Sequence, residues 1–406
     1  MKILLVSEDI PSKTLGGLGK HVIALGNALI AAGHEVSLMG CDTPSYILCA
    51  EEMGFQGKFI AAFGNPLRGW KESQLGFFNS WKRPYFAKKM AKKIQSYAKS
   101  FDVVHYHGHQ PMVGRYIAPW VNFVQTRHDQ GGDCITNVRF RHGEICVERS
   151  PAECAKCIHP SPGLVHTKLS AHAVQRYRDE TSAAFELHPV VFVSEFLRKN
   201  YALTMPKVLL EKTIVIHNFV NEDLLGESLF TKQTEMNTTT FHIHVAGRLD
   251  AGKGISTFLD LIEPRLPSNW RVDVYGDGPL REMIDAKYVD SLVRIHGYCS
   301  YPEVVAATRN ANVVVVPSMW EEACGTTIIE ALRLGKICYA LRRGGTSELA
   351  SYGQSNQLRL FDDLTTLTDA LLTANDFTDR TGGESADVRL HVLKLLPVYA
   401  RNKRSA

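Results

Sequence analysis

Residues 313–334 read VVVVPSMWEEACGTTIIEALRL, which is typical of a buried strand, a loop and the start of a helix. Four successive valines without polar alternation predict a buried parallel strand over 313–316. Small residues then open a helix that we expect over 328–334, and they are Gly325, Thr326 and Thr327. Such a helix start offers unsatisfied backbone N–H groups and the positive end of the helix dipole to a phosphate.

Two carboxylates flank this helix start, Glu322 in the loop and Glu330 in the helix. Glu330 lies more than one turn into a helix that begins near Gly325, so we do not expect it to reach the same ligand atom as Glu322. The spacing therefore predicts that the two acids hold different parts of one long ligand that carries phosphate.

Length and composition predict a soluble protein of two domains. A chain of 406 residues is too long for one ordinary core, and 45% hydrophobic and 22% charged residues are usual for globular proteins. The net charge of +4 gives no support for a nucleic-acid partner. The first apolar run, 3–6, is too short for a signal peptide, and no run approaches the roughly 18 residues of a membrane span, so we expect a cytoplasmic protein.

The pattern of strand, glycine-rich loop and helix occurs in both halves of the chain. This alternation predicts an α/β fold with doubly wound parallel sheets, in which ligands bind at the carboxyl ends of the strands. We place the domains at 1–218 and 219–385, with a polar linker region at 221–240 and a C-terminal helix or tail at 386–406. The expected strands are 3–6, 36–39, 103–105, 123–126, 190–194, 213–218, 241–246, 271–275, 293–296 and 313–316.

Two glycine-rich loops are candidate phosphate sites. Gly16 and Gly17 could let backbone N–H groups approach an anion, or they could form a tight turn. Arg248 and Lys253 flank the turn that begins at Gly247, after the strand 241–246. An arginine fork and a lysine point charge suit a pyrophosphate, although two solvated loop charges are the ordinary alternative.

Histidines follow two strands of the first half. His128 comes after the strand 123–126, where it could donate a hydrogen bond to a substrate oxygen or serve only the structure of the loop. His105, His107 and His109 form a run without metal-ligand spacing, and we interpret them as part of the loop structure.

Four of the nine cysteines fall between 134 and 157, in an insert after His128. A Cys-x-x-Cys pair with two further thiols can hold a tetrahedral structural zinc ion, and an iron–sulfur cluster is a second possibility. Disulfides are the main alternative, and they fit a reducing compartment poorly. The candidate ligands are Cys134, Cys146, Cys154 and Cys157.

The segment 81–101 is basic and without an acidic residue, and its apolar side chains recur at helical spacing. This pattern predicts a basic amphipathic helix that contacts an anionic membrane surface or acceptor, or else a solvated face over an ordinary core stripe. Its cations are Lys82, Arg83, Lys88, Lys89, Lys92, Lys93 and Lys99.

Together these residues resemble the retaining, nucleotide-sugar-dependent glycosyltransferases of the GT-B type, and more narrowly family 4, the glycogen-synthase-like group. The resemblance covers about residues 1–350, and its most specific elements are Glu322-x7-Glu330 and the loop from Gly247 to Gly254. Gly344-Gly345-Thr346-Ser347-Glu348 also matches the family. The resemblance implies two Rossmann-like domains that face each other across a cleft and close over the substrates.

The activity implied by the resemblance is transfer of a sugar from a nucleoside-diphosphate sugar, with retained configuration and without a catalytic metal. The acceptor would be a glycan or a lipid-linked sugar. Some bacterial members that look like polysaccharide enzymes carry a four-cysteine insert, so the resemblance extends to cell-surface polysaccharide synthesis, including lipopolysaccharide. A nucleotide-sugar epimerase of the same architecture and a zinc-stabilised binding module are the alternatives.

The resemblance also implies roles for individual residues. Arg248 and Lys253 would neutralise the departing diphosphate, and the N–H groups of Gly325, Thr326 and Thr327 would help to hold it. Glu322 would bind sugar hydroxyls, and Glu330 would bind the ribose. From the first half, His128 matches the active-site histidine of the family, and Gly16 and Gly17 would approach the phosphate. Tyr298 would lie near the nucleobase.

The chain departs from the family pattern at two places. Ala323-Cys324 stand where Pro-Phe is common, and Asn218-Phe219 stand where Asn-Gly is usual. The first departure prevents the sequence from naming the sugar.

Overall fold

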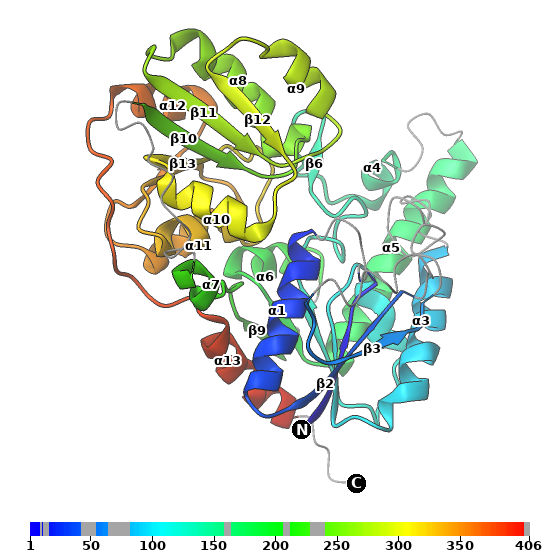
Figure 1. The fold of residues 1–406 in the computed structure, drawn as a ribbon. Helices are drawn as coiled ribbons and strands as arrows, with labels where there is room; N and C mark the ends of the chain where they lie inside the picture. Colours follow the sequence, from blue (N-terminus) through cyan, green and yellow to red (C-terminus); the bar gives the residue numbers. More distant parts are fainter. Residues whose placement is uncertain are drawn as a thin grey trace. The chain divides into compact units, whose positions relative to one another are not determined.

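The computed structural model describes residues 1–8, 10, 16–41, 54–63, 82–157, 164–205, 212–227 and 240–401. The chain divides into two compact units. Unit 1 comprises Met1–Arg139, Val147–His217 and Val388–Ala406, and unit 2 comprises Phe140–Cys146 and Asn218–Asp387. Figure 1 shows both units and labels many of their helices and strands.

Unit 1 is built on a seven-stranded parallel sheet with the order β3-β2-β1-β4-β5-β8-β9. Its central strands are buried apart from Lys2 at the start of β1, and β1 is otherwise apolar, as is usual for parallel strands covered on both faces. The strands are β1 (Lys2–Val6), β2 (Glu35–Gly40), β3 (Lys58–Ala61), β4 (Val103–Tyr106), β5 (Phe123–Arg127), β8 (Val190–Phe192) and β9 (Thr213–Val215).

The helices of unit 1 bury one face each against this sheet. In α3, Met90 and Ile94 are completely buried in the core that also contains Leu4 and Val6 of β1. The larger helical elements are α1 (Gly17–Ala31), α3 (Lys82–Ala98), η2 (Pro111–Tyr116), α4 (Pro151–Ala155), α5 (Leu164–Leu187), α6 (Glu195–Ala202) and α13 (Val388–Arg401).

The C-terminal helix α13 belongs to unit 1, although 386–406 was predicted as a separate helix or tail. Leu395 and Tyr399 are completely buried. The Tyr399 hydroxyl lies 2.7 Å from Nδ1 of His105 in β4, and its carbonyl accepts a hydrogen bond of 2.8 Å from Asn122. These contacts explain why the chain returns to the first unit after the second is complete.

Unit 2 contains a six-stranded parallel sheet with the order β12-β11-β10-β13-β14-β15, the same winding about its first strand as in unit 1. The fold class predicted from the sequence is therefore confirmed as two Rossmann-like α/β units. The strands are β10 (Phe241–Ala246), β11 (Trp270–Tyr275), β12 (Val293–Gly297), β13 (Val313–Val316), β14 (Cys338–Leu341) and β15 (Leu358–Phe361).

The helices of unit 2 follow its strands as the sequence predicts. The helix expected over 328–334 begins two residues earlier, as α11 (Thr326–Arg333). The others are α7 (Glu222–Glu227), α8 (Ile255–Ile262), α9 (Arg281–Lys287), α10 (Tyr301–Asn310), η6 (Gly344–Tyr352) and α12 (Leu364–Thr373). Most of the predicted linker, 228–239, lies outside the described residues.

The predicted insert 134–157 is divided between the units. The two-stranded antiparallel hairpin of β6 (Phe140–Arg141) and β7 (Glu144–Ile145) belongs to unit 2. In contrast, α4 packs against α5 in unit 1. None of the helices in the described ranges is both long and apolar enough to cross a membrane.

Candidate active site

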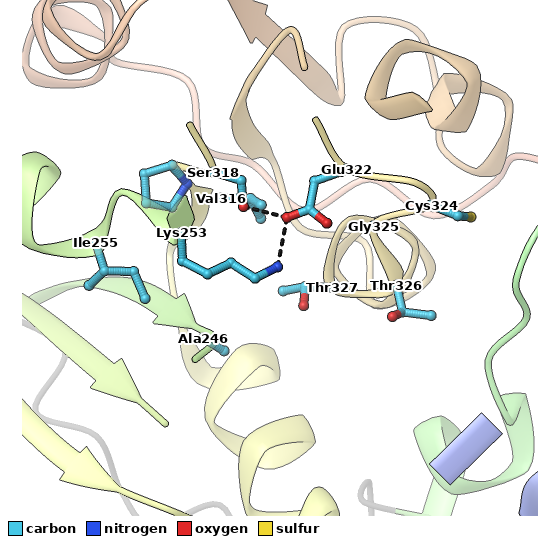
Figure 2. Close-up of a pocket in the computed structure, with 12 residues that line it drawn as sticks. Ala246, Lys253, Ile255, Val316, Ser318, Glu322, Cys324, Gly325, Thr326 and Thr327 are labelled. Atoms are coloured by element: carbon cyan, nitrogen blue, oxygen red, sulfur yellow. Dashed lines mark hydrogen bonds and ion pairs between the residues drawn. The ribbon is translucent and has the colours of Figure 1, made fainter. Parts of the chain in front are cut away.

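A pocket of about 90 Å³ lies in unit 2 where β10 and β13 end and α11 begins. Figure 2 shows Lys253 and Ser318 directed at the carboxylate of Glu322, with Thr326 and Thr327 at the start of the helix. The pocket is lined by Ala246, Gly247, Lys253, Ile255, Val316, Pro317, Ser318, Glu322, Cys324, Gly325, Thr326 and Thr327.

The carboxylate of Glu322 is the electrostatic centre of this pocket. Its Oε1 accepts hydrogen bonds from Lys253 Nζ at 2.7 Å, from Trp320 Nε1 at 3.0 Å and from the Ser318 hydroxyl. Burial by itself would raise the pKa of Glu322, but the charge of Lys253 and these hydrogen bonds lower it below its ordinary value. Glu322 is therefore ionised at neutral pH.

Two glycines allow Lys253 to reach Glu322. Gly254 has a φ of +67°, and a Cβ there would lie 2.2 Å from the carbonyl oxygen of Pro317. A Cβ at Gly252 would lie 2.4 Å from the ring of Trp320. The turn thus packs directly against the loop after β13, and the Lys253 ammonium lies 5.0 Å from the centroid of the Trp320 ring.

The start of α11 supplies the second feature suited to phosphate. Gly325 is the N-cap residue, with extended backbone and no side-chain cap hydrogen bond. The first N–H groups of a helix have no partner within the helix, and Thr326 and Thr327 line the pocket. An ammonium and a helix N-terminus therefore border the same small space.

Three other residues of unit 2 were predicted to bind the donor, and they are not among the described residues that line the pocket. Arg248 has a side chain that is 66% exposed and pairs with Asp250 at 3.3 Å. Tyr298 is 53% exposed, in the loop after β12. Glu330 accepts a hydrogen bond from Tyr301, whose pKa is raised by burial and by the nearby carboxylate.

The two departures from the family pattern contact each other. The backbone N–H of Asn218 donates to Sγ of Cys324 at 3.4 Å, and its side-chain amide donates to the Cys324 carbonyl at 3.3 Å. Burial raises the pKa of Cys324 to about 12, so this pocket residue is a neutral thiol at neutral pH. Residue 218 thus fixes the loop that leads into α11.

In unit 1, Gly16 and Gly17 begin helix α1. Gly16 is the N-cap residue, both glycines are exposed, and a Cβ on either would meet no atom of the described residues within 4 Å. Gly16 and Gly17 thus differ from Gly254, whose turn is packed against a neighbouring loop.

His128 follows β5 and lies among other histidines of unit 1. Its Nε2 is 3.0 Å from Nδ1 of His107, and its ring centroid is 4.7 Å from that of His21. Burial and the charge of Arg127 lower the pKa of His128 to about 3, against the opposing effect of Asp129. His128 is therefore a neutral imidazole that can donate a hydrogen bond without carrying charge.

The run of histidines at 105–109 is not simply a loop. His105 lies in β4, and its two ring nitrogens meet Tyr399 at 2.7 Å and Thr126 at 2.8 Å. His107 and His109 follow the strand, and His109 Nδ1 is 2.8 Å from Asp129 Oδ2. The strand predicted over 103–105 is confirmed and includes His105, so the interpretation of this one histidine as loop structure is wrong.

The four cysteines predicted as metal ligands lie in different units. Cys134, Cys154 and Cys157 belong to unit 1, and Cys146 belongs to unit 2. Sγ of Cys154 accepts a hydrogen bond from Arg178 at 3.3 Å, and Sγ of Cys134 lies 3.1 Å from the Thr136 hydroxyl. In the described part of the chain, the set of three ligand atoms that lie within 4.8 Å of one another is formed by His21, His107 and His128 rather than by cysteines.

The basic helix predicted over 81–101 is present as α3, with one correction. Arg83 is completely buried, donates to the carbonyl of Ile135 at 2.8 Å and lies over the ring of Tyr177. Because it supports the core, it does not belong to the exposed cationic face. Trp81 lies outside the described residues.

Sequence reasoning missed several residues that support the candidate sites. Ser318 and Trp320 bind Glu322 from the same loop, so their proximity in sequence could have suggested them. Tyr301 and His21 approach Glu330 and His128 from other elements, and no local pattern indicates those contacts.

The fold and this pocket define a glycosyltransferase of the GT-B class. Residues 15–224 match the family described as Glycosyltransferase Family 4, and residues 240–375 match Glycosyl transferases group 1. Because the first match covers more than half of the chain, the chain belongs to glycosyltransferase family 4 and is an enzyme. This assignment favours a transferase over the epimerase and binding-module alternatives.

Known proteins agree with this assignment. An uncharacterized glycosyltransferase of Methanocaldococcus jannaschii, MJ1607, is 22% identical over 87% of this chain and 83% of its own length. The structure of Anabaena HepE in complex with UDP has a TM-score of 0.63 at 15% identity, covering 99% of this chain and 98% of that one. WaaG, a glycosyltransferase involved in lipopolysaccharide biosynthesis, has a TM-score of 0.56 at 14% identity, covering 99% and 94%.

Proposed function

We propose that this enzyme transfers a sugar from a nucleoside-diphosphate sugar to a glycan or lipid-linked acceptor, with retained configuration, in cell-surface polysaccharide synthesis. The observation that carries the proposal is the Lys253–Glu322 pair beside the start of α11. The cation and the helix start suit a diphosphate, and the carboxylate suits sugar hydroxyls. The UDP in the similar HepE structure and the role of WaaG support the donor class and the pathway.

Lys253 and α11 would act on the leaving group. When the bond between the anomeric carbon and the diphosphate oxygen breaks, its electron pair stays on that oxygen. The ammonium and the N–H groups of Gly325 to Thr327 would stabilise the developing charge. The acceptor oxygen would form its bond on the same face, and its proton would pass to the departing oxygen. We therefore propose that transfer needs no metal at this pocket.

Glu322 would position the sugar. One of its oxygens already accepts the hydrogen bonds from Lys253, Ser318 and Trp320. The other oxygen could then accept from a sugar hydroxyl while the side chain stays fixed. This arrangement would orient the anomeric carbon relative to the diphosphate before the reaction begins.

Other residues would act at the ends of the substrates. Glu330, held by Tyr301, would accept hydrogen bonds from the ribose, and Tyr298 would contact the nucleobase. The exposed guanidinium of Arg248 would turn toward the diphosphate when the donor binds. In unit 1, neutral His128 would donate a hydrogen bond to a sugar oxygen, and Gly16 and Gly17 would leave space for the phosphate.

A thermal-shift screen with UDP, GDP, ADP and their sugars tests the donor assignment. The correct donor should raise the unfolding temperature in a concentration-dependent manner. NMR analysis of the product should show the same anomeric configuration as in the donor. Inverted configuration would exclude retention, and donor isomerisation without an acceptor would instead support an epimerase.

The exposed lysines of α3 support a peripheral contact with an anionic membrane. Lys88, Lys92 and Lys93 of α3 and Lys99 just after it are exposed, and Met90 and Ile94 pack the helix against the core. Cosedimentation with vesicles containing anionic lipid should exceed that with neutral vesicles and should decrease with salt. Charge reversal of Lys92 and Lys93 should abolish the difference.

The cysteine insert remains a predicted site for structural zinc, with iron–sulfur the less favoured alternative. The hydrogen bond from Arg178 to Cys154 is of the kind that stabilises a thiolate ligand. Metal analysis of the purified protein should find about one zinc per chain. The Cys154→Ser and Cys157→Ser variants should lose it if the cysteines are its ligands.

A further inference from the structure

Three histidines from three separate elements of unit 1 gather at the carboxyl ends of two adjacent strands. His107 follows β4, His128 follows β5, and His21 lies in α1. The parallel pairing of β4 with β5 brings the first two together, and the direction of α1 adds the third. Ligands bind at this edge in sheets of this type.

Their nitrogen atoms are close enough for one ion. One ring nitrogen from each histidine lies within 4.8 Å of the other two, and His107 Nδ1 is 3.0 Å from His128 Nε2. Tetrahedral zinc–imidazole bonds place ligand nitrogens roughly 3.3 Å apart, so modest rotations of the rings would bring them into position. His128 is only partly buried, which provides an entry path.

The surroundings separate these three histidines from the others nearby. His105 is already held by Tyr399 and Thr126, so it is not available as a ligand. In contrast, Nε2 of His107 is buried and has no hydrogen-bond partner among the residues that the structure describes. Such a buried polar atom has a free-energy cost that metal binding and the accompanying rotation of the ring could relieve.

We propose that His21, His107 and His128 form a site for a divalent transition-metal ion of the class that imidazole prefers, such as Zn²⁺, Co²⁺ or Ni²⁺. With three protein ligands, the fourth position would be taken by water. The site is distinct from the predicted cysteine site. Metal binding would also occupy His128 and so inhibit sugar transfer, a consequence that rests on the proposed function.

Titration of metal-depleted protein with Co²⁺ tests the site independently of activity. Coordination by imidazoles should produce visible d–d absorption without the near-ultraviolet sulfur-to-cobalt bands of thiolate ligands. Saturation should occur at one ion per chain in protein that carries Cys154→Ser and Cys157→Ser. Thiolate bands alone, or binding that disappears with these cysteine substitutions, would overturn the proposal.

Two substitutions locate the site, and one serves as control. His21→Gln and His107→Asn should each weaken Co²⁺ binding at least tenfold, since even the loss of an outer-shell partner costs 10–100-fold. His142→Ala removes an exposed histidine and should bind Co²⁺ like the parent. Thermal unfolding of the metal-free variants identifies any that fail to fold. If both folded variants bind like the parent, the assignment is wrong.

The inhibition is measured separately. Zn²⁺ should reduce transfer in the parent protein, and a chelator should restore it. If the Co²⁺ titration succeeds but no donor supports transfer, the proposed function fails while the metal site stands. If transfer occurs but Co²⁺ does not bind, the metal site alone is wrong.

Discussion

The two units share a sheet order but place different chemistry at the carboxyl ends of corresponding strands. In unit 2, Lys253 and the ionised Glu322 form a charged pair beside a helix start. In unit 1, His21, His107 and His128 are neutral, because burial and nearby positive charge lower the pKa of each ring. The shared topology thus determines where polar side chains gather, and under the proposed function the charged pair would bind the diphosphate and the neutral histidines the sugar.

The largest expected effect is that of Lys253→Ala. This substitution removes the proposed partner of the leaving diphosphate and leaves Glu322 buried without its cation. Loss of one such transition-state contact costs about 3–4 kcal/mol, so kcat/KM should fall about 10²- to 10³-fold. Steady-state kinetics with the donor from the ligand screen measures the change.

His128→Ala provides the matched comparison in unit 1. Because His128 is neutral, its substitution should lower kcat/KM less than Lys253→Ala does and should leave affinity for the free nucleoside diphosphate unchanged. An equal loss of diphosphate affinity in both variants would remove the proposed division of roles between the units.

The two glycine-rich loops differ in a second way that stability can measure. At Gly254 an alanine would adopt a left-handed conformation and meet the Pro317 carbonyl, so Gly254→Ala should destabilise unit 2 by about 2–4 kcal/mol. At Gly16 the φ is −70° and a Cβ would meet no atom of the described residues, so Gly16→Ala should change stability by less than about 1 kcal/mol. Thermal denaturation of both variants should show this contrast, and equal shifts would contradict it.

The sequence predicted the elements more fully than the contacts. The valine run at 313–316, the small residues at 325–327 and the glycine turn before α8 identify their local structures, because each depends on neighbouring residues. Glu322 and Lys253 could be placed at one site because both follow parallel strands. The burial of Arg83 against Tyr177 could not be predicted, since it depends on packing between α3 and α5.

The histidine set shows the same limit. Residues 21, 107 and 128 have no periodic relation in the sequence, and their proximity results from the strand order β1-β4-β5 and from the direction of α1. Likewise, α13 belongs to unit 1 because Tyr399 contacts His105, a residue that is distant in the sequence. Contacts between distant segments are decided by tertiary packing, which no local pattern records.

Unit 2 also contains a buried neutral imidazole. His244 lies in β10, and its Nε2 is 3.1 Å from the Thr308 hydroxyl. Burial lowers its pKa from 6.5 to about 4. The unfolded chain therefore binds the proton more readily than the folded chain. The contribution of His244 to the free energy of unfolding is fully present above pH 6.5 and decreases as the pH falls toward 4. Between pH 6.5 and 5, the loss should be about 2 kcal/mol.

Urea denaturation at several pH values measures this loss. His244→Phe keeps a ring that can pack against Tyr275 but removes the titrating group, so stability should depend less on pH over this window. His142→Ala, at an exposed position, should keep the slope of the parent. An unchanged slope in His244→Phe would show that other groups control the acid sensitivity of unit 2.

The smallest expected effect concerns the second carboxylate of unit 2. Tyr301 donates a hydrogen bond to Glu330, and both lie outside the pocket that contains Glu322. If Glu330 holds the ribose, Tyr301→Phe should weaken binding of the nucleoside diphosphate about three- to tenfold, the cost of one lost positioning hydrogen bond. Glu330→Ala should weaken this binding further.

Neither change should alter the affinity for inorganic diphosphate, which lacks a ribose, whereas Lys253→Ala should weaken the binding of both ligands. Calorimetric titration with the two ligands therefore separates the ends of the donor, and equal losses for both in Tyr301→Phe would assign Glu330 to the structure of α11 instead.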